Sequence, residues 1–282
     1  MAPLQPKTKH ALLVDIGNDI VSTCLEKPTG IYSVNKLKMQ KYLNDAEKNK
    51  AGSYADFHYI HALVNTVQGD LKAAKYSYSV ALKNDSHNAV ILGNYATLLV
   101  DMHKYDEAKN ILERLIVDLK LHDETVQHSV YRIALNTLDL SFLSRFKENK
   151  MFTLNPYLTT QISQLKEDIG YIDISIEEYT DFIKLLTSFI LSKTRQNFQP
   201  RFSINNGLDK NLVVEVFLDM NSDEASSLNS EFTTLFVENT FENGNYELLG
   251  KFIIFFKQRQ SRYDGSENPD CLYLGMNEEL GA

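Results

Sequence analysis

The chain has 282 residues, which is enough for two ordinary domains, each with its own core. Hydrophobic residues make up 43% of the sequence and charged residues 23%, a composition typical of globular proteins, so wholesale disorder is excluded. The net charge of −8 argues against a nucleic-acid binder that works by neutralising phosphates.

Cysteine content and apolar runs bear on the compartment. The two cysteines, Cys24 and Cys271, form no CxxC pair, so we expect neither a disulfide framework nor a cysteine zinc site. No apolar stretch of signal-peptide length precedes Asp15. Apolar runs such as Phe252–Phe256 are too short to span a bilayer. These features predict a soluble, cytoplasmic protein without a membrane segment.

Residues 1–32 are predicted to be a loose amino-terminal segment. Prolines and Gly30 interrupt it, and one apolar patch, Ala11–Ile16, predicts a short helix or strand. The stretch LVDIGND (residues 13–19) has the Asp and Gly of the phosphate turn of actin-like ATPases. The further motifs of those enzymes are missing, so we interpret it as a short strand and a turn. From residue 33 onward, apolar residues at helical spacing predict an exposed helix.

Residues 55–122 contain two windows of 34 residues with the same pattern of small and large apolar side chains. Each window divides into two helices, with a turn near Gly69 in the first and near His103 in the second. Small residues let paired helices approach closely. No single unit can bury its own apolar face, so stacking explains the repeated spacing. The matched positions are Ala62 and Ala96, Leu71 and Tyr105, Ala74 and Ala108, Tyr78 and Leu112, and Ala81 and Leu115.

This pattern resembles the tetratricopeptide repeat (TPR) family. The resemblance rests on Gly69, Leu71, Ala74, Tyr78 and Ala81 in one unit and on Ala96, Tyr105, Ala108 and Leu112 in the other. The sequence departs from the family pattern at four positions: His58 and His61 replace the usual Trp and Leu, Ser86 replaces a common proline, and His103 replaces glycine. The resemblance implies stacked helical hairpins with a concave face that binds proteins.

The helical pattern continues beyond the two units. Val126 to Phe142 predict a divergent third unit or a cap, which repeat arrays require. A further helix is expected from Pro156 to about Ile169. Ser175 and Glu178 form a capping box that opens another helix with a strong apolar stripe. We therefore expect a TPR-like helical array with capping helices over residues 33–196.

The pattern changes after residue 197. Asn211–Asp219 is predicted to form a strand, and Asn221 is predicted to cap the helix that follows. Tyr246–Gln258 is predicted to form a second strand that is buried on both faces, and Arg201–Asn205 an additional strand. The predicted fold class is mostly α, with TPR-like hairpin repeats followed by a small α+β domain at 197–260. The tail, residues 261–282, is predicted to be mobile.

Two groups of residues in the sequence have side chains suited to chemistry. His58 and His61 lie on one helix face, but no third ligand has a recognisable spacing, so we interpret them as packing histidines. The second group consists of carboxylates around the strand–helix junction, where the first-turn acids suit the helix dipole and no nuclease pattern is complete. The carboxylates of this second group are Asp209, Glu215, Asp219, Asp223 and Glu224. We predict no catalytic residues, no metal and no cofactor.

The partner-binding groove is predicted on the first helix of each unit. The family's clamp for a terminal carboxylate has Lys and Asn where this chain has Tyr59 and Leu63, and only Asn94 matches, so a clamp is not expected. The resemblance places Asp56, Tyr59, Ile60, Leu63, Thr66, Val90, Asn94, Thr97 and Asp101 in the groove. This mixture suits an apolar segment or helix with some positive charge. An equal alternative is that the helix at 33–48 or the carboxy-terminal domain fills the groove.

Three functions follow from this reading. The first is a non-enzymatic protein–protein interaction module, a TPR-type scaffold or regulatory subunit. The second is a sensor–effector protein whose α+β domain is an unrecognised enzyme or nucleotide-binding unit, which would need a convergent polar site at the strand ends. The third is a single body that serves homo-oligomerisation.

Overall fold

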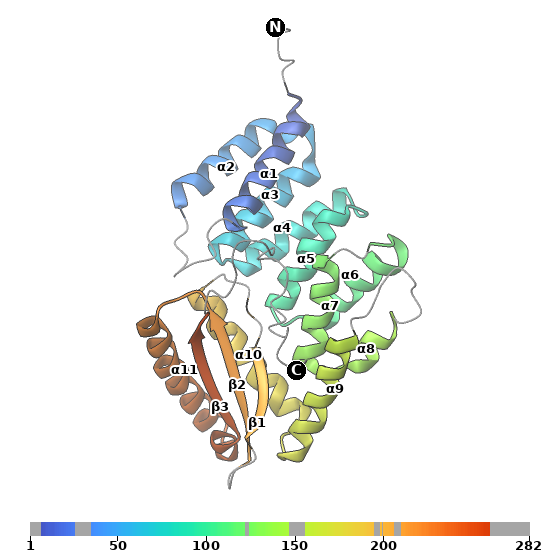
Figure 1. The fold of residues 1–282 in the computed structure, drawn as a ribbon. Coiled ribbons are helices and arrows are strands. Elements are labelled where there is room, and N and C mark those ends of the chain that lie inside the picture. The colour runs from blue at the N-terminus through green and yellow to red at the C-terminus, as the bar shows by residue number, and fades with distance from the viewer. Residues whose placement is uncertain are drawn as a thin grey trace, which may run out of the picture. The chain divides into compact units, whose positions relative to one another are not determined.

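The computed structural model describes residues 7–25, 35–121, 124–146, 156–194, 198, 200–205 and 210–259 (Figure 1). Contacts divide the chain into two compact units. Unit 1 comprises residues 1–27, 33–133 and 141–154, and unit 2 comprises residues 28–32, 134–140 and 155–282. The described residues form α-helices and one small sheet, which confirms the predicted fold class.

The elements follow one another with short connections through most of the chain. In order they are α1 (Lys9–Leu25), α2 (Lys36–Asn49), η1 (Lys50–Gly52), α3 (Tyr54–Gln68), α4 (Leu71–Asn84), α5 (Ala89–Asp101), α6 (Tyr105–Glu113), the π-helix η2 (Arg114–Asp118), α7 (Glu124–Thr137), α8 (Leu140–Ser144), α9 (Pro156–Tyr171), α10 (Ile176–Lys193), β1 (Pro200–Asn205), β2 (Asn211–Leu218), α11 (Ser222–Glu242), η3 (Tyr246–Gly250) and β3 (Phe252–Gln258).

Helix α1 corrects the expectation for residues 1–32. The stretch LVDIGND, interpreted above as a strand and a turn, lies entirely within α1. Leu13 and Ile20 are 1% and 0% exposed, and Gly17 lies between them on the same buried side. Spacings of four and three residues place all three on one helix face, so burial against neighbouring helices overrides the weak helix propensity of glycine.

The two predicted repeat units are present as antiparallel hairpins, α3 with α4 and α5 with α6. The expected small residues allow the helices to pack closely, because Ala62, Ala74, Ala96 and Ala108 are all 0% exposed. The larger partners are buried as well: Tyr78 is 1% exposed and Leu112 is 0% exposed. The stacking argument made from the sequence is therefore confirmed.

The turns of the two hairpins share one backbone geometry. Gly69 has φ of 80°, and His103, at the matched position, has φ of 56°. In each turn the next N–H reaches back to the end of the preceding helix: Asp70 N donates to Asn65 O at 2.9 Å, and Lys104 N donates to Leu99 O at 2.8 Å. His103 therefore adopts a conformation that glycine adopts without strain.

Neighbouring helices extend this array within unit 1. The first residues of α2 and α4 are 35 positions apart, and Ala46 of α2 is 0% exposed, like Ala81 of α4. Beyond α6 the chain continues with α7 and the five-residue α8, of which residues up to 133 and from 141 onward belong to unit 1. Lys75 of α4 pairs with Glu107 of α6 at 2.7 Å. Glu113, the last residue of α6, pairs with Arg145, which follows α8. The first ion pair joins α4 to α6, and the second joins α6 to the residue that follows α8.

Unit 2 contains a three-stranded sheet of order β1-β2-β3, with β1 antiparallel and β3 parallel to β2. The strand–helix–strand unit β2–α11–β3 and the additional strand β1 are as predicted. Alternate residues of β2 are fully buried on one face: Leu212, Val214, Val216 and Leu218 are each 0% exposed. The other face of the sheet carries half-buried and exposed side chains.

Helices α9 and α10 belong to the same unit as the sheet, whereas the sequence placed them in the array ending at 196. The apolar stripe of α10 explains the difference, since it faces β3 and α11. The Phe182 ring stacks on Phe252 with centroids 4.0 Å apart, and Phe189 contacts Phe232 at 5.2 Å and Phe256 at 5.7 Å. The turn between α9 and α10 repeats the hairpin geometry, with Asp173 at φ of 56°.

The last predicted strand is shorter than expected. Residues 246–250 form the 3₁₀-helix η3, and β3 begins only at Phe252. The expectation that this strand is buried on both faces is wrong, because Phe255 is 42% exposed. β3 is an edge strand with helices against one face, and the amide of Asn229 in α11 bonds both the N–H and the C=O of Phe256.

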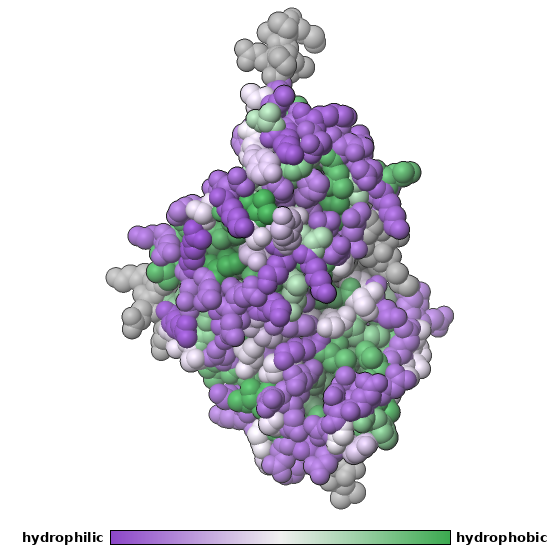
Figure 2. Space-filling model, turned by 180° about the vertical axis from the view of Figure 1, so that it is seen from behind, coloured by the Kyte–Doolittle hydropathy of each residue, from purple (hydrophilic) through white to green (hydrophobic). Residues whose placement is uncertain are grey.

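On the face shown in Figure 2, hydrophilic residues predominate and hydrophobic ones gather in separate clusters. Among the described residues no helix combines the length and the apolar character needed to cross a bilayer.

Candidate functional site: the inner helices of unit 1

The first helices of successive hairpins in unit 1 lie side by side and are joined by polar contacts. His10 Nδ1 of α1 is 2.9 Å from Asp56 Oδ2 of α3. Asn94 Nδ2 of α5 donates to Tyr59 OH of α3 at 3.1 Å. Arg132 Nη2 of α7 donates to Asp101 Oδ1 of α5 at 2.7 Å. We call the row α1, α3, α5 and α7 up to Ile133 the inner row.

The contacts show that α1 takes the place of a first helix ahead of α3. His10 meets Asp56 near the starts of both helices, and Gly17, further along α1, packs against the Tyr59 ring. The two helices therefore run in the same direction. Asp19 of α1 in turn accepts a hydrogen bond from Tyr42 of α2 at 2.5 Å, so α1 also contacts the second helix of its own hairpin.

The nine predicted groove residues divide by burial. Tyr59, Ile60 and Leu63 are 9%, 1% and 6% exposed, because α1 and α5 flank α3. Val90 is 61% exposed. The remaining five residues are half-buried: Asp56, Thr66, Asn94, Thr97 and Asp101.

Most of the half-buried groove residues already make hydrogen bonds. Thr66 Oγ1 donates to Ala62 O at 2.8 Å, and Thr97 Oγ1 donates to Gly93 O at 3.2 Å. Thr97 Oγ1 also lies 3.4 Å from Ser129 Oγ of α7. The first two bonds fix the side chains within their own helices, and the Thr97–Ser129 contact joins α5 to α7.

Burial controls the electrostatics of the inner row. Desolvation, with a smaller contribution from Asp56, raises the pKa of Tyr59 to about 12. Desolvation and the nearby Arg132 lower the pKa of His128 in α7 to about 3, so this imidazole is neutral at physiological pH. The Asp101–Arg132 pair keeps both charges compensated at 20% and 21% side-chain exposure.

Sequence reasoning missed the residues that α1 and α7 contribute. Val14 and Val21 of α1 are 42% and 36% exposed. Each lies four positions after a residue that contacts α3, His10 and Gly17 respectively, so both valines share the side of α1 next to α3. The spacing of Leu13, Gly17 and Ile20 could have revealed α1, but Gly17 suggested a turn. Ser129 and Arg132 lie beyond the two matched windows.

The two histidines of α3 lie in an aromatic cluster with Phe57. His58 and His61 are half-buried, and their ring centroids are 5.0 and 4.6 Å from that of Phe57. Lys50 Nζ lies 4.6 Å from the Phe57 centroid. Burial lowers the pKa of both histidines. They occupy packing positions, as the packing interpretation expects.

The carboxylates of unit 2 lie in separate structural contacts. Glu215 pairs with Lys257 of β3, and Asp219 lies 3.3 Å from Arg259. Glu224 accepts from Asn221 N at 2.9 Å in a capping box, with Asp223 beside it in the first turn of α11. Asp209 lies outside the described residues. Across the part of the chain that the structure describes, no three acidic, histidine or cysteine side chains converge as metal ligands.

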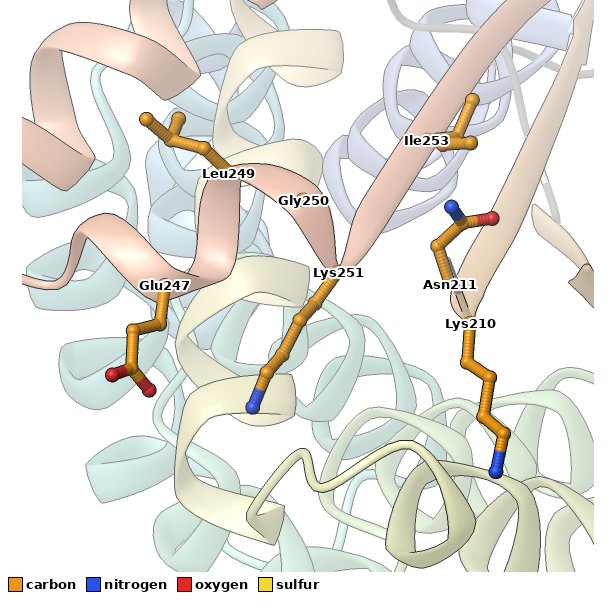
Figure 3. Close-up of a pocket in the computed structure, with 7 residues that line it drawn as sticks. All are labelled: Lys210, Asn211, Glu247, Leu249, Gly250, Lys251 and Ile253. Atoms are coloured by element: carbon orange, nitrogen blue, oxygen red, sulfur yellow. The ribbon is translucent and has the colours of Figure 1, made fainter. Parts of the chain in front are cut away.

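A pocket of about 640 Å³ lies in unit 2 and was not predicted (Figure 3). It opens where β2 and β3 begin, and its lining includes Lys210, Glu247 and Lys251. Lys251 Nζ donates to Asp173 O at 2.5 Å, and Lys210 Nζ lies 3.8 Å from the Tyr171 ring centroid. Both lysines thus contact the α9–α10 turn.

Comparison with known proteins bears on unit 1. Residues 68–120 match a tetratricopeptide repeat family model. The matched segment runs from the end of α3 through η2 and so includes the hairpin turns at Gly69 and His103. No curated protein and no solved structure matches the chain. The match confirms the TPR resemblance over this segment and indicates a protein–protein interaction module in general terms.

Proposed function

We propose that the chain is a TPR-type scaffold or regulatory subunit that binds a protein partner through the inner row of unit 1. The observation that carries this proposal is the row itself, in which helices of successive hairpins are joined by His10–Asp56, Asn94–Tyr59 and Arg132–Asp101. Such rows give repeat arrays their extended binding surfaces.

The residues that would contact the partner differ from those predicted from the sequence, because several predicted groove residues are buried. Tyr59, Ile60 and Leu63 support the surface from within, and the accessible apolar side chains are Val14, Val21 and Val90. Asn94 lies one helical turn after Val90 on α5 and is a half-buried polar group. Exposed valines suit an apolar segment or helix of the partner.

The sensor–effector alternative has less support. It needs polar groups that converge at the strand ends, and among the described candidates Glu215 and Asp219 are engaged with Lys257 and Arg259. Homo-oligomerisation would use the same exposed valines and is distinguished by the identity of the captured protein.

The test is affinity capture from native cells with the full chain and matched variants. Val21→Asp and Val90→Asp place a charge on the inner row at exposed sites, and Val117→Asp does so at a 60% exposed site on η2. We expect a stoichiometric protein with the wild type and with Val117→Asp, and its loss with the other two. Thermal unfolding confirms that each variant is folded. Equal capture by all four proteins would exclude the inner row.

A further inference from the structure

Four large apolar side chains are exposed at two neighbouring turns of unit 2. Tyr171 and Ile176 flank the α9–α10 turn and are 58% and 42% exposed. Phe241 and Tyr246 flank the turn after α11 and are 55% and 56% exposed, with ring centroids 5.0 Å apart. We call these four residues the turn surface. In unit 1, by contrast, the exposed large apolar residues are spread over α1 to α5 and η2.

Side-chain contacts join the two turns. Asn245 Nδ2 lies 3.5 Å from Glu178 Oε1, and Lys251 Nζ donates to the carbonyl of Asp173. Lys210 Nζ packs over the Tyr171 ring. Glu178 is itself held in the capping box with Ser175. The aromatic side chains are therefore carried on turns fixed to one another, which lowers the entropy lost when a partner binds.

The charges around the turn surface are mainly negative. Asp173, Glu177, Glu242 and Glu247 are all exposed. The ion pairs among the described residues of unit 2 use other acids, namely Asp181, Glu215, Asp219 and Glu231. Among the described residues, the cations that contact the α9–α10 turn are Lys210 and Lys251, which are fewer than these four carboxylates.

A recess adjoins this surface. The 640 Å³ pocket is lined by Glu247, Leu249, Gly250 and Ile253 in addition to the two lysines, and Tyr246 immediately precedes Glu247 (Figure 3). The lining is mixed, with Asn211 as a further polar residue, and its apolar part, Leu249 and Ile253, offers a place for one apolar anchoring side chain close to Tyr246, as binding hot spots do.

We propose that the turn surface is a second docking site, which binds a protein segment that combines apolar or aromatic residues with lysine or arginine. Charge complementarity selects this partner: arginine and lysine pair with Asp173, Glu177, Glu242 and Glu247 and stack on Tyr171 and Tyr246, while an acidic segment is repelled. The net charge of −8 acts in the same direction. This inference is independent of the inner row.

The test uses a random-peptide display library selected against the full-length chain, followed by fluorescence anisotropy with the enriched peptides. Tyr246→Ala, Phe241→Ala and Glu247→Lys probe the turn surface. The matched controls are Tyr76→Ala, at a 70% exposed tyrosine of α4, and Asp118→Lys, at an exposed carboxylate of η2. All lie at exposed positions, and thermal unfolding checks the fold of each.

We expect enriched peptides with basic and apolar residues, whose Kd rises by about tenfold or more in Tyr246→Ala and Phe241→Ala and also rises in Glu247→Lys. The two controls should leave the Kd unchanged, and added salt should weaken binding. Failure to enrich any peptide, enrichment of acidic peptides, or binding indifferent to the three variants would overturn the proposal. So would a self-association that depends on Tyr246, or peptide binding only after residues 260–282 are removed.

Discussion

Replacing Gly52 with alanine tests how α1 is held in the inner row. A Cβ at this position would lie 2.5 Å from His10 N and 2.6 Å from Lys9 C, both backbone atoms that cannot turn aside. To restore ordinary contact, η1 and the start of α1 must separate by about 1 Å, and overpacking of this kind costs about 1–3 kcal/mol. Complete release of α1 would expose Leu13 and Ile20, at a cost of about 1.5–3 kcal/mol each. This cost sets an upper limit on the loss of stability.

The assay combines chemical denaturation with hydrogen exchange. Gly52→Ala should lower the free energy of unfolding by about 1–3 kcal/mol. It should also speed exchange in α1 more than in α5. The matched control is Gly93→Ala in α5, where a Cβ would meet nothing within 4 Å. That change should stabilise the protein by about 0.5–1 kcal/mol through helix propensity. If Gly52→Ala leaves both the denaturation midpoint and the exchange of α1 unchanged, the packing of α1 described above is wrong.

Three further predictions concern the array. Leu63→Ala should cost about 2–5 kcal/mol in denaturant unfolding because this side chain is 6% exposed, and a loss below about 1 kcal/mol would place it in an open groove. Lys104→Asp should stabilise the protein by about 1 kcal/mol, because Asp70 caps α4 by accepting a hydrogen bond from Ala73 N, whereas the side chain of Lys104 makes no such bond to α6. An unchanged melting temperature would contradict this capping argument. His128 has a folded pKa near 3 against an ordinary 6.5, so its neutral form supports the fold above pH 6.5 and this support falls as the pH drops toward 3. The loss at pH 5 is about 2 kcal/mol, and His128→Gln should reduce the acid slope of unfolding; parallel curves would refute the assignment.

The repeat spacing predicted the hairpins α3–α4 and α5–α6. Ala62, Ala74, Ala96 and Ala108 are the contact residues of the hairpins because close helix packing admits only small side chains there, so their periodicity could be read directly. The strand–helix–strand unit was equally visible, since the capping box at Asn221 separates two apolar runs.

The errors arose where tertiary packing overrides local pattern. Gly17 looks like a turn residue but lies in a helix against the Tyr59 ring. The stripe of α10 fits a repeat array and a sheet equally well, and only the contacts of Phe182 and Phe189 with β3 decide between them. A single sequence cannot tell which surface an amphipathic helix covers.

The repeat register placed the predicted groove residues on helices of the inner row but did not show which of them are accessible. The register placed Val90, Asn94 and Asp101 on the inner row, where they are half-buried or exposed. Tyr59 and Leu63 are buried because α1 lies beside α3, and that helix was read as a loose segment. The turn surface of unit 2 depends on two turns far apart in the sequence and has no local pattern.

Photo-crosslinking from single positions tests the inner row most directly. A photoreactive residue replaces Val90, which is 61% exposed on α5, or Val117, which is 60% exposed on η2, in the full chain within native cells. We predict a discrete protein adduct from position 90 that is missing from position 117. Adducts of the same protein from both positions, or an adduct from position 117 alone, would contradict the assignment of the inner row as the partner-binding surface.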